Sequence, residues 1–262
     1  ASPAPDWAFV IPKVVAISLV LLATIAASVL ASLLVQFFKG YANVEIGKYL
    51  AWYVAPWTVD IILIAILAVF IQALVPHKFV GWLVMLVFIV AQIVAARLGY
   101  EHNLYQYATS PPVPLSDMNG SGRFLEYSAW LRAYWSAFAV LLVVASYAIW
   151  RRGVSAPLLV RLRGIPRRLL GTAGVIAAVA VVLTAGLGGY IFYNTNVLNE
   201  YRTSIGNDEW LANYEKALLQ FENVPQPRIT DVTLNVQLFP LEPRALTTGR
   251  YVIENRTAPP LV

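Results

Sequence analysis

Five long apolar segments constrain the fold of this chain more than any other feature of its sequence. A helix needs about 20 predominantly apolar residues to cross the roughly 30 Å hydrocarbon core of a bilayer. The chain is 59% hydrophobic and 13% charged, whereas soluble domains are about 45–50% apolar and about 25% charged. We therefore expect an all-α polytopic membrane protein with five transmembrane helices. The predicted spans lie near residues 14–38, 57–75, 79–96, 130–150 and 169–192, within a membrane domain of residues 1–193.

Basic residues near the ends of the spans predict the orientation of the chain. Cytoplasmic loops carry an excess of Lys and Arg, and the loop between the fourth and fifth spans is rich in arginine. We therefore expect this loop to be cytoplasmic and the tail after Phe192 to be extracytoplasmic. The arginines serve either as a topology determinant or as a contact for anionic lipid or an acidic partner. They are Arg151, Arg152, Arg161, Arg163, Arg167 and Arg168.

The polar tail predicts a helix followed by strands. Segment 207–209 carries two acids, which suit the first turn of a helix. From Ile229 the apolar residues recur largely two apart, and a second strand candidate follows Gly249. Two strands are not stable alone in water. We therefore expect an extracytoplasmic helical linker over 194–228 and the opening strands of a truncated β domain over 229–262.

Three polar residues within the spans are candidates for a substrate pathway: Asp60, Gln72 and Gln92. Polar and ionisable groups at membrane depth are costly and often functional. Asp60 lies about one turn into the second predicted span, so it is also placed to reach interfacial water or to cap its neighbours. The spans hold no series of carboxylates or histidines, which argues against a proton-driven pump.

The loop between the third and fourth spans carries the most distinctive polar motif of the chain. His102, together with Glu101 and Asp117, has the residue types of a metal site. A single histidine does not force such a site to form, so we favour a structural hydrogen-bonding role for His102. The loop's prolines and glycines also require defined turns. Its candidate functional residues are His102, Asn103, Tyr105, Asp117, Asn119 and Gly120.

Several kinds of chemistry are excluded by what the sequence lacks. It contains no cysteine, which excludes disulfides and thiolate metal sites. It also contains no phosphate-binding loop, His-Glu-x-x-His, Gly-x-Ser-x-Gly or Ser-x-x-Lys motif. We therefore expect no catalytic residue and no bound cofactor in this chain. The net charge of +5 is explained by the basic ends of the spans, so we expect no nucleic-acid partner.

Longer motifs in the loop and the tail resemble one family. They are His102-Asn103-Leu104-Tyr105, Ser116-Asp117-Met118-Asn119-Gly120, Tyr193-Asn194-Thr195-Asn196, Tyr214-Glu215-Lys216 and Pro225-Gln226-Pro227-Arg228-Ile229-Thr230. Together they resemble large bacterial fusion proteins in which an ABC-type exporter permease of the type-2 class precedes an aminopeptidase-N-like zinc metallopeptidase. The segments Ile229–Phe239 and Gly249–Thr257 resemble the two opening strands of the β-sandwich of that peptidase.

This resemblance implies a specific set of partners and cofactors. It implies a bacterial inner-membrane location, a separate cytoplasmic ATPase subunit that binds ATP, and a second permease copy in a homodimer. Zinc is expected in the peptidase domain, whose metal-binding and substrate-binding motifs do not occur in this sequence, so no catalytic residue is transferred. Because the chain begins at Ala1 without an initiator Met, we expect it to be a segment of a larger protein.

Two functional hypotheses follow from the sequence. In the first, the chain is the membrane permease segment of an ABC-type export system, fused to an extracytoplasmic aminopeptidase-like domain. In the alternative, the five helices are a non-transporting anchor that holds the metallopeptidase at the membrane. An intramembrane enzyme is disfavoured because the spans lack paired catalytic side chains.

Overall fold

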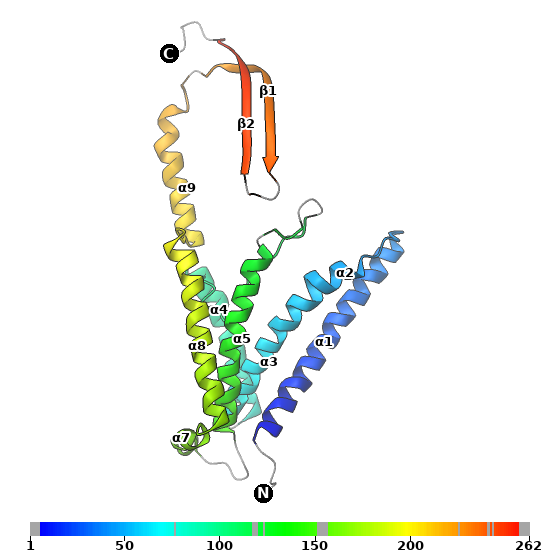
Figure 1. Cartoon of the computed structure of the whole chain (residues 1–262), viewed down its shortest axis with the longest axis vertical. Coiled ribbons are helices and arrows are strands. Elements are labelled where there is room, and N and C mark those ends of the chain that lie inside the picture. The colour runs from blue at the N-terminus through cyan, green and yellow to red at the C-terminus, as the bar shows by residue number, and fades with distance from the viewer. Residues whose placement is uncertain are drawn as a thin grey trace. The chain divides into compact units, whose positions relative to one another are not determined.

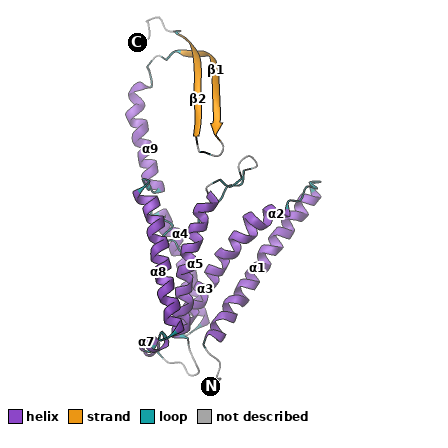
Figure 2. Cartoon of the chain, viewed as in Figure 1, coloured by secondary structure: helices purple, strands orange, loops and turns teal. Residues whose placement is uncertain are grey.

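The computed structural model describes two separate units of this chain (Figure 1). The contacts divide it into Ala1–Thr203, which holds the long apolar helices, and Ser204–Val262, which holds the polar tail. The strands found in the described residues lie in the second unit (Figure 2). The residues described are 6–75, 77–116, 120–122, 124–150, 157–224, 226–239, 242 and 244–256.

Within the described residues, five helices of the first unit are long and apolar enough to cross a membrane, as the sequence predicted. Two of them are extended by π-helical turns, at the start of α3 and at the end of α8. The helices are α1 (Trp7–Phe38), α2 (Ile46–Lys48) continuing through η1 (Tyr49–Val54) into α3 (Ala55–Leu74), α4 (Lys78–Arg97), α5 (Phe124–Ile149), and α8 (Thr172–Phe192) continuing into η2 (Tyr193–Val197).

Several helices extend beyond the spans that hydropathy predicted. Helix α1 begins at Trp7 rather than near residue 14, and α5 begins at Phe124 rather than near residue 130. The apolar run reports only the part of a helix that lies in hydrocarbon. Backbone hydrogen bonding continues through polar residues such as Lys13 and Glu126, which lie outside the spans predicted from hydropathy.

Helices α3 and α5 form the centre of the first unit. Their buried side chains, which include Leu63, Ile66, Trp135 and Ala139, pack into one apolar cluster together with Tyr107 from the α4–α5 loop. Helix α1 packs on α3, α4 packs on α3, and α8 packs on α5. The three outer helices leave most of their apolar side chains exposed, so the lipid bilayer is the solvent that suits them.

Two glycines allow close approach between neighbouring helices. A Cβ atom on Gly188 of α8 would lie 3.0 Å from the ring of Tyr134 on α5. A Cβ atom on Gly81 of α4 would collide with the side chain of Gln72 on α3. Gly188 therefore sets the spacing of α8 on α5, as is common between helices in membranes, and Gly81 leaves room for the flexible amide end of Gln72.

Two arginines close one end of the first unit, which we call the arginine end. It carries the short helices α6 (Leu158–Arg163) and α7 (Ile165–Arg168). Arg161 Nη1 donates hydrogen bonds to the carbonyl oxygens of Ala73 (2.7 Å) and Ile149 (3.0 Å), and Arg161 Nη2 donates to that of Leu74 (3.1 Å). These carbonyls belong to the last turns of α3 and α5, where the backbone carbonyl oxygens have no N–H partner within the helix. Arg161 therefore caps both central helices.

Arg168 makes a second cap and ties the start of α1 to it. Its Nη1 atom lies 3.2–3.3 Å from the carbonyl oxygens of Tyr147, Ala148 and Trp150 at the end of α5. The same nitrogen lies 3.2 Å from Oδ2 of Asp6, whose side chain is 8% exposed. Positive charge at a helix C-terminus also stabilises the helix dipole.

The second unit contains a helix and a two-stranded hairpin. Helix α9 (Ser204–Leu218) ends in a 3₁₀ turn, η3 (Leu219–Phe221), and begins slightly before the predicted acidic segment. Strands β1 (Arg228–Phe239) and β2 (Arg244–Glu254) pair antiparallel, with an irregularity near the start of β1. The second strand was predicted too late, from Gly249, because the polar residues at its start hide the apolar alternation. Thr257, the predicted end of that strand, lies outside the described residues.

The two faces of the hairpin differ in polarity. One face carries Val232, Leu234, Val236 and Leu238 of β1, with Tyr251, Gly249, Thr247 and Ala245 of β2 directly opposite them. The other face carries mainly polar residues, among them Asp231, Thr233 and Asn235. The large apolar side chains of the first face are exposed, Leu238 by 71%. A hairpin of this kind needs cover on its apolar face to be stable in water.

Replacing the capping arginine tests the closure of the arginine end. Arg161→Gln removes donors from buried carbonyls of α3 and α5, so we expect the free energy of unfolding to fall by about 1–3 kcal/mol. Arg163→Gln is the matched control, since the Arg163 side chain is exposed, and should change stability by less than about 0.5 kcal/mol. Thermal unfolding of the purified chain in detergent measures both. Equal losses in the two variants would contradict the capping role.

Candidate functional site

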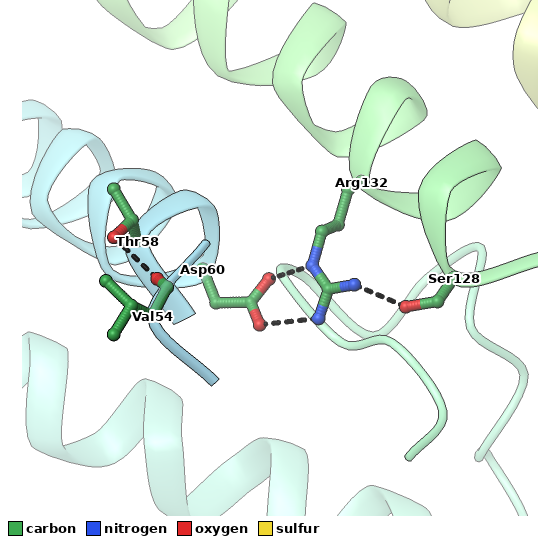
Figure 3. Close-up of polar contacts among 5 residues, drawn as sticks. All are labelled: Val54, Thr58, Asp60, Ser128 and Arg132. Carbon is green, nitrogen blue, oxygen red and sulfur yellow. Dashed lines mark hydrogen bonds and ion pairs between the residues drawn. The ribbon is translucent and has the colours of Figure 1, made fainter. Parts of the chain in front are cut away.

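An ion pair joins the two central helices of the first unit. Arg132 of α5 donates from Nε to Asp60 Oδ1 (2.9 Å) and from Nη2 to Asp60 Oδ2 (3.0 Å), in a bidentate arrangement (Figure 3). Arg132 Nη1 also donates to the hydroxyl of Ser128, which is fully buried. The Arg132 side chain is 16% exposed and the Asp60 side chain is 23% exposed. Two parallel hydrogen bonds fix both the distance and the relative rotation of α3 and α5 at this level.

A pocket of about 380 Å³ lies beside this ion pair. Asp60 and Arg132 form its charged wall, and Trp52 and Trp57 contribute aromatic surface. Pro111 and Pro112 of the α4–α5 loop line it from the side of the loop. The pocket therefore combines a charged pair with apolar walls, which suits an amphipathic molecule better than an ion.

The α4–α5 loop is held against helices α3 and α5 by hydrogen bonds. Tyr107 is 6% exposed, and its hydroxyl donates to the carbonyl oxygen of Leu63 on α3 (2.8 Å). Burial raises the pKa of the Tyr107 phenol, so the hydroxyl stays protonated and remains a donor. The carbonyl oxygens of Asn103 and Leu104 accept hydrogen bonds from Trp135 Nε1 (3.2 Å) and from the Tyr134 hydroxyl (3.0 Å) of α5.

His102 connects this loop to the end of α8. Its Nδ1 accepts a hydrogen bond from the backbone N–H of Leu104 (3.2 Å), so the proton lies on Nε2 and is donated to Asn196 Oδ1 of η2 (3.0 Å). The rings of His102 and Tyr201 are 4.5 Å apart. His102 is 6% exposed, and both of its nitrogens are used in the folded chain. The residues of the loop and of η2 that make these contacts lie at the end of the unit opposite α6 and α7, which we call the loop end.

The three residues predicted to line a substrate pathway lie in different places. Asp60 borders the pocket described above. Gln92 of α4 donates to the carbonyl oxygen of Tyr107 (3.3 Å). Gln72 lies at the arginine end, where its amide donates to the carbonyl oxygen of Lys78, the first residue of α4 (3.2 Å). The structure therefore does not bring the three together, and their role in transport stays a prediction.

The remaining predicted residues are divided between the loop and the arginine end. Asn103 donates to the Tyr127 hydroxyl (3.4 Å), Tyr105 is exposed, and Gly120 pairs with Ser116 in a backbone bridge. Asp117 and Asn119 lie outside the described residues, as do Arg151 and Arg152. Arg161 and Arg168 are the helix caps, and Arg163 and Arg167 are exposed on α6 and α7.

The sequence analysis missed the partner of Asp60. Arg132 falls within the predicted span 130–150 but was not considered as a partner for Asp60; in the structure it lies two turns inside α5. The signal was present, because Asp60 and Arg132 are the innermost acid and base of the described helices α3 and α5. Two opposite charges at membrane depth are expected to pair. The contacts of Tyr107 and of Asn196 had no such signal, since they depend on how the loop folds back.

Comparisons with known proteins add no assignment to this geometry. No protein-family model, curated protein or solved structure matches the chain. Within the described residues, no group of three or more His, Asp or Glu side chains is placed to hold a metal ion. The findings support a multi-pass membrane protein, and the family resemblance of the loop and tail motifs stays a hypothesis.

The Asp60–Arg132 pair is tested by a double-mutant cycle. Arg132→Met leaves a partly buried carboxylate without its partner, so we expect a loss of about 3–5 kcal/mol in the free energy of unfolding. The double variant Asp60→Leu/Arg132→Met leaves no unpaired charge and should lose much less than the sum of the single variants. Thermal unfolding in detergent measures all three.

A second, more exposed pair serves as the control for this cycle. Glu45 Oε2 and Lys48 Nζ are 2.8 Å apart, with side chains 46% and 40% exposed. Glu45→Gln and Lys48→Met should each cost about 0–1 kcal/mol. Additive losses at Asp60 and Arg132, of the same size as at this control pair, would show that the two central helices do not depend on the buried pair.

Proposed function

We propose that this chain is the membrane permease segment of an ABC-type export system that continues into an extracytoplasmic aminopeptidase-like domain. The observation that carries the proposal is the hairpin that follows the five apolar helices. Its apolar face, with Val232, Leu234, Val236 and Leu238, is exposed along the whole strand. Such a face suits the inner side of a larger β-sandwich. An apolar bundle followed by the start of a sandwich is the order of elements in the fusion proteins that the motifs resemble.

Gly249 supports this interpretation of the hairpin. It lies opposite Leu234, and a Cβ atom at Gly249 would collide with the Leu234 side chain. The glycine therefore lets the leucine lie across β2 and broadens the apolar face. In a sandwich this face would be covered by a second sheet, and the polar face with Asn235 would remain in water.

Several features of the first unit support a transport role. The pocket beside Asp60 and Arg132 combines charged and aromatic surface, which fits amphipathic cargo. The exposed apolar faces of α1, α4 and α8 leave room for a second permease copy as well as lipid. We place the arginine end in the cytoplasm, by the excess of basic residues there, and the loop end and tail outside a bacterial inner membrane. ATP would be hydrolysed by a separate ATPase subunit at the arginine end, and zinc would belong to the peptidase.

The alternative is a membrane anchor without transport activity. This alternative is favoured by the polar groups of the helices, because Asp60, Gln72 and Gln92 all form hydrogen bonds within the chain. In an anchor, these contacts would serve only to hold the helices together. The two functions differ in whether an ATPase binds at the arginine end.

Purification of the protein expressed from its native gene tests the proposal. After gentle solubilisation of the membranes, we expect an ATPase subunit to co-purify and the preparation to have aminopeptidase activity that a zinc chelator abolishes. Leu234→Asp, on the apolar face, should abolish this activity by preventing sandwich formation, whereas Asn235→Asp, on the polar face, should retain it. Peptidase activity without a bound ATPase would favour the anchor, and the absence of both would contradict the proposal.

A further inference from the structure

A second pocket, of about 290 Å³, lies at the loop end between the last turn of α1 and the π-helix η1. Tyr49, Trp52 and Tyr53 of η1 form one wall, and Gln36 of α1 forms part of the opposite wall. Tyr41, from the α1–α2 connection, adds a fourth aromatic ring. The pocket is separate in its polar groups from the ion pair of Asp60 and Arg132, and it does not depend on the function proposed above.

The aromatic wall of this pocket is held in place by hydrogen bonds to α1. Gln36 Nε2 donates to the Tyr49 hydroxyl (2.7 Å), and the Tyr53 hydroxyl lies 3.0 Å from Ser28 Oγ. These hydrogen bonds hold the rings of Tyr49 and Tyr53 on the side of η1 that faces α1, and Trp52 lines both this pocket and the pocket beside Asp60. Short π-helical segments are rare and are found frequently at functional sites. The wall is therefore formed before any ligand binds.

One acceptor in the wall has no donor. Gln36 Oε1 is buried, and no hydrogen-bond partner for it occurs among the described residues. Buried acceptors in native structures are nearly always paired, so an unpaired one requires an explanation. Gln36 lines the pocket and its amide nitrogen donates to Tyr49, so a ligand that enters the pocket and displaces the atoms covering the oxygen can supply the missing N–H or O–H.

The pocket also carries one charge of each sign. Glu45 and Lys48 both line it and form the exposed ion pair described above. A ligand with a cationic amine and an anionic phosphate matches these groups. Its amine donates to Gln36 Oε1 and to the Glu45 carboxylate and lies against the aromatic faces, which attract cations. Its phosphate accepts from the Lys48 ammonium.

The position of the pocket along α1 identifies the source of such a ligand. A 32-residue helix is about 48 Å long, slightly more than the roughly 40–45 Å thickness of a bilayer with its headgroups. Gln36 is two residues from the end of this helix, which places the pocket at the level of the lipid headgroups. We propose that this pocket binds the headgroup of an ethanolamine phospholipid, with Gln36 Oε1 accepting a hydrogen bond from its ammonium group.

Methylation of the headgroup tests this proposal, because each methyl removes one N–H donor. Native mass spectrometry of the purified chain measures the binding of phosphatidylethanolamine, its monomethyl and dimethyl forms, and phosphatidylcholine, all with the same acyl chains. We expect the ethanolamine and monomethyl forms, which retain the two N–H donors that Gln36 and Glu45 require, to bind alike. The dimethyl form should bind about tenfold more weakly, as for the loss of one charge-assisted hydrogen bond, and the choline form more weakly still. Soluble glycerophosphoethanolamine should bind more weakly than the lipid; equal binding would show that the ligand is a free metabolite and overturn the lipid assignment.

Substitution at Gln36 separates this site from general lipid contact. Gln36→Leu should abolish the preference for ethanolamine over choline. Ser32→Ala is the matched control, because Ser32 lies one turn earlier on α1, and its hydroxyl donates to the carbonyl oxygen of Ser28 rather than lining the pocket. If Gln36→Leu does not fold, Glu45→Gln takes its place and should reduce the preference.

Three results would overturn the proposal. The first is equal binding of the ethanolamine and choline lipids to the unsubstituted chain. The second is an unchanged preference in Gln36→Leu or, where that variant does not fold, in Glu45→Gln. The third is a change in the number of chain copies in Gln36→Leu, without a change in lipid preference, which would assign the pocket to an interface between copies.

Discussion

In the hydrocarbon core of a bilayer no water is available to a charge or to an unpaired backbone group, so each must find its partner within the protein. The first unit meets this constraint at three levels. Asp60 and Arg132 neutralise each other between α3 and α5, Tyr107 donates to the carbonyl of Leu63 on the side of the loop, and Arg161 caps the carbonyl ends of both helices. The central helix pair is therefore joined at two neighbouring levels in its loop-end half, because Asp60 and Leu63 both lie within the first nine residues of α3, and it is capped at the arginine end.

The outer parts of the chain follow from this central pair. Helices α1, α4 and α8 each pack on one of the two central helices and leave their remaining apolar surface to lipid or to another copy. The α4–α5 loop binds both central helices and reaches η2 through His102, so it links α3, α5 and α8 at the loop end. In the first unit the polar groups need partners in lipid. In the hairpin of the second unit the apolar face needs to be covered in water. Cover by further β structure is what the proposed peptidase domain would supply.

The sequence predicted the elements better than it predicted the contacts. Hydropathy identified the five helices because membrane insertion depends on local composition, which a single sequence displays. It placed the starts of α1 and α5 too late, since polar residues at a helix end look like loop. Arg132 was recognisable as the partner of Asp60 from its depth in the membrane alone. The hydrogen bond between Tyr107 and Leu63 joins residues 44 positions apart, and it depends on the path of a loop that sequence composition does not reveal. The arginines were recognised by their charge, but the role of Arg161 and Arg168 as caps depends on where α3 and α5 end.

Membrane topology is the claim on which the remaining interpretation rests, and the absence of cysteine from the chain makes it directly measurable. Single cysteines at exposed positions can be labelled in intact spheroplasts with a maleimide that does not cross membranes. We predict that Thr109→Cys in the α4–α5 loop and Thr248→Cys in the hairpin react from outside, and that Arg163→Cys reacts only after the membrane is permeabilised. Reaction of Thr109→Cys and Arg163→Cys from the same side would contradict a bundle whose loop end and arginine end lie on opposite faces of the bilayer.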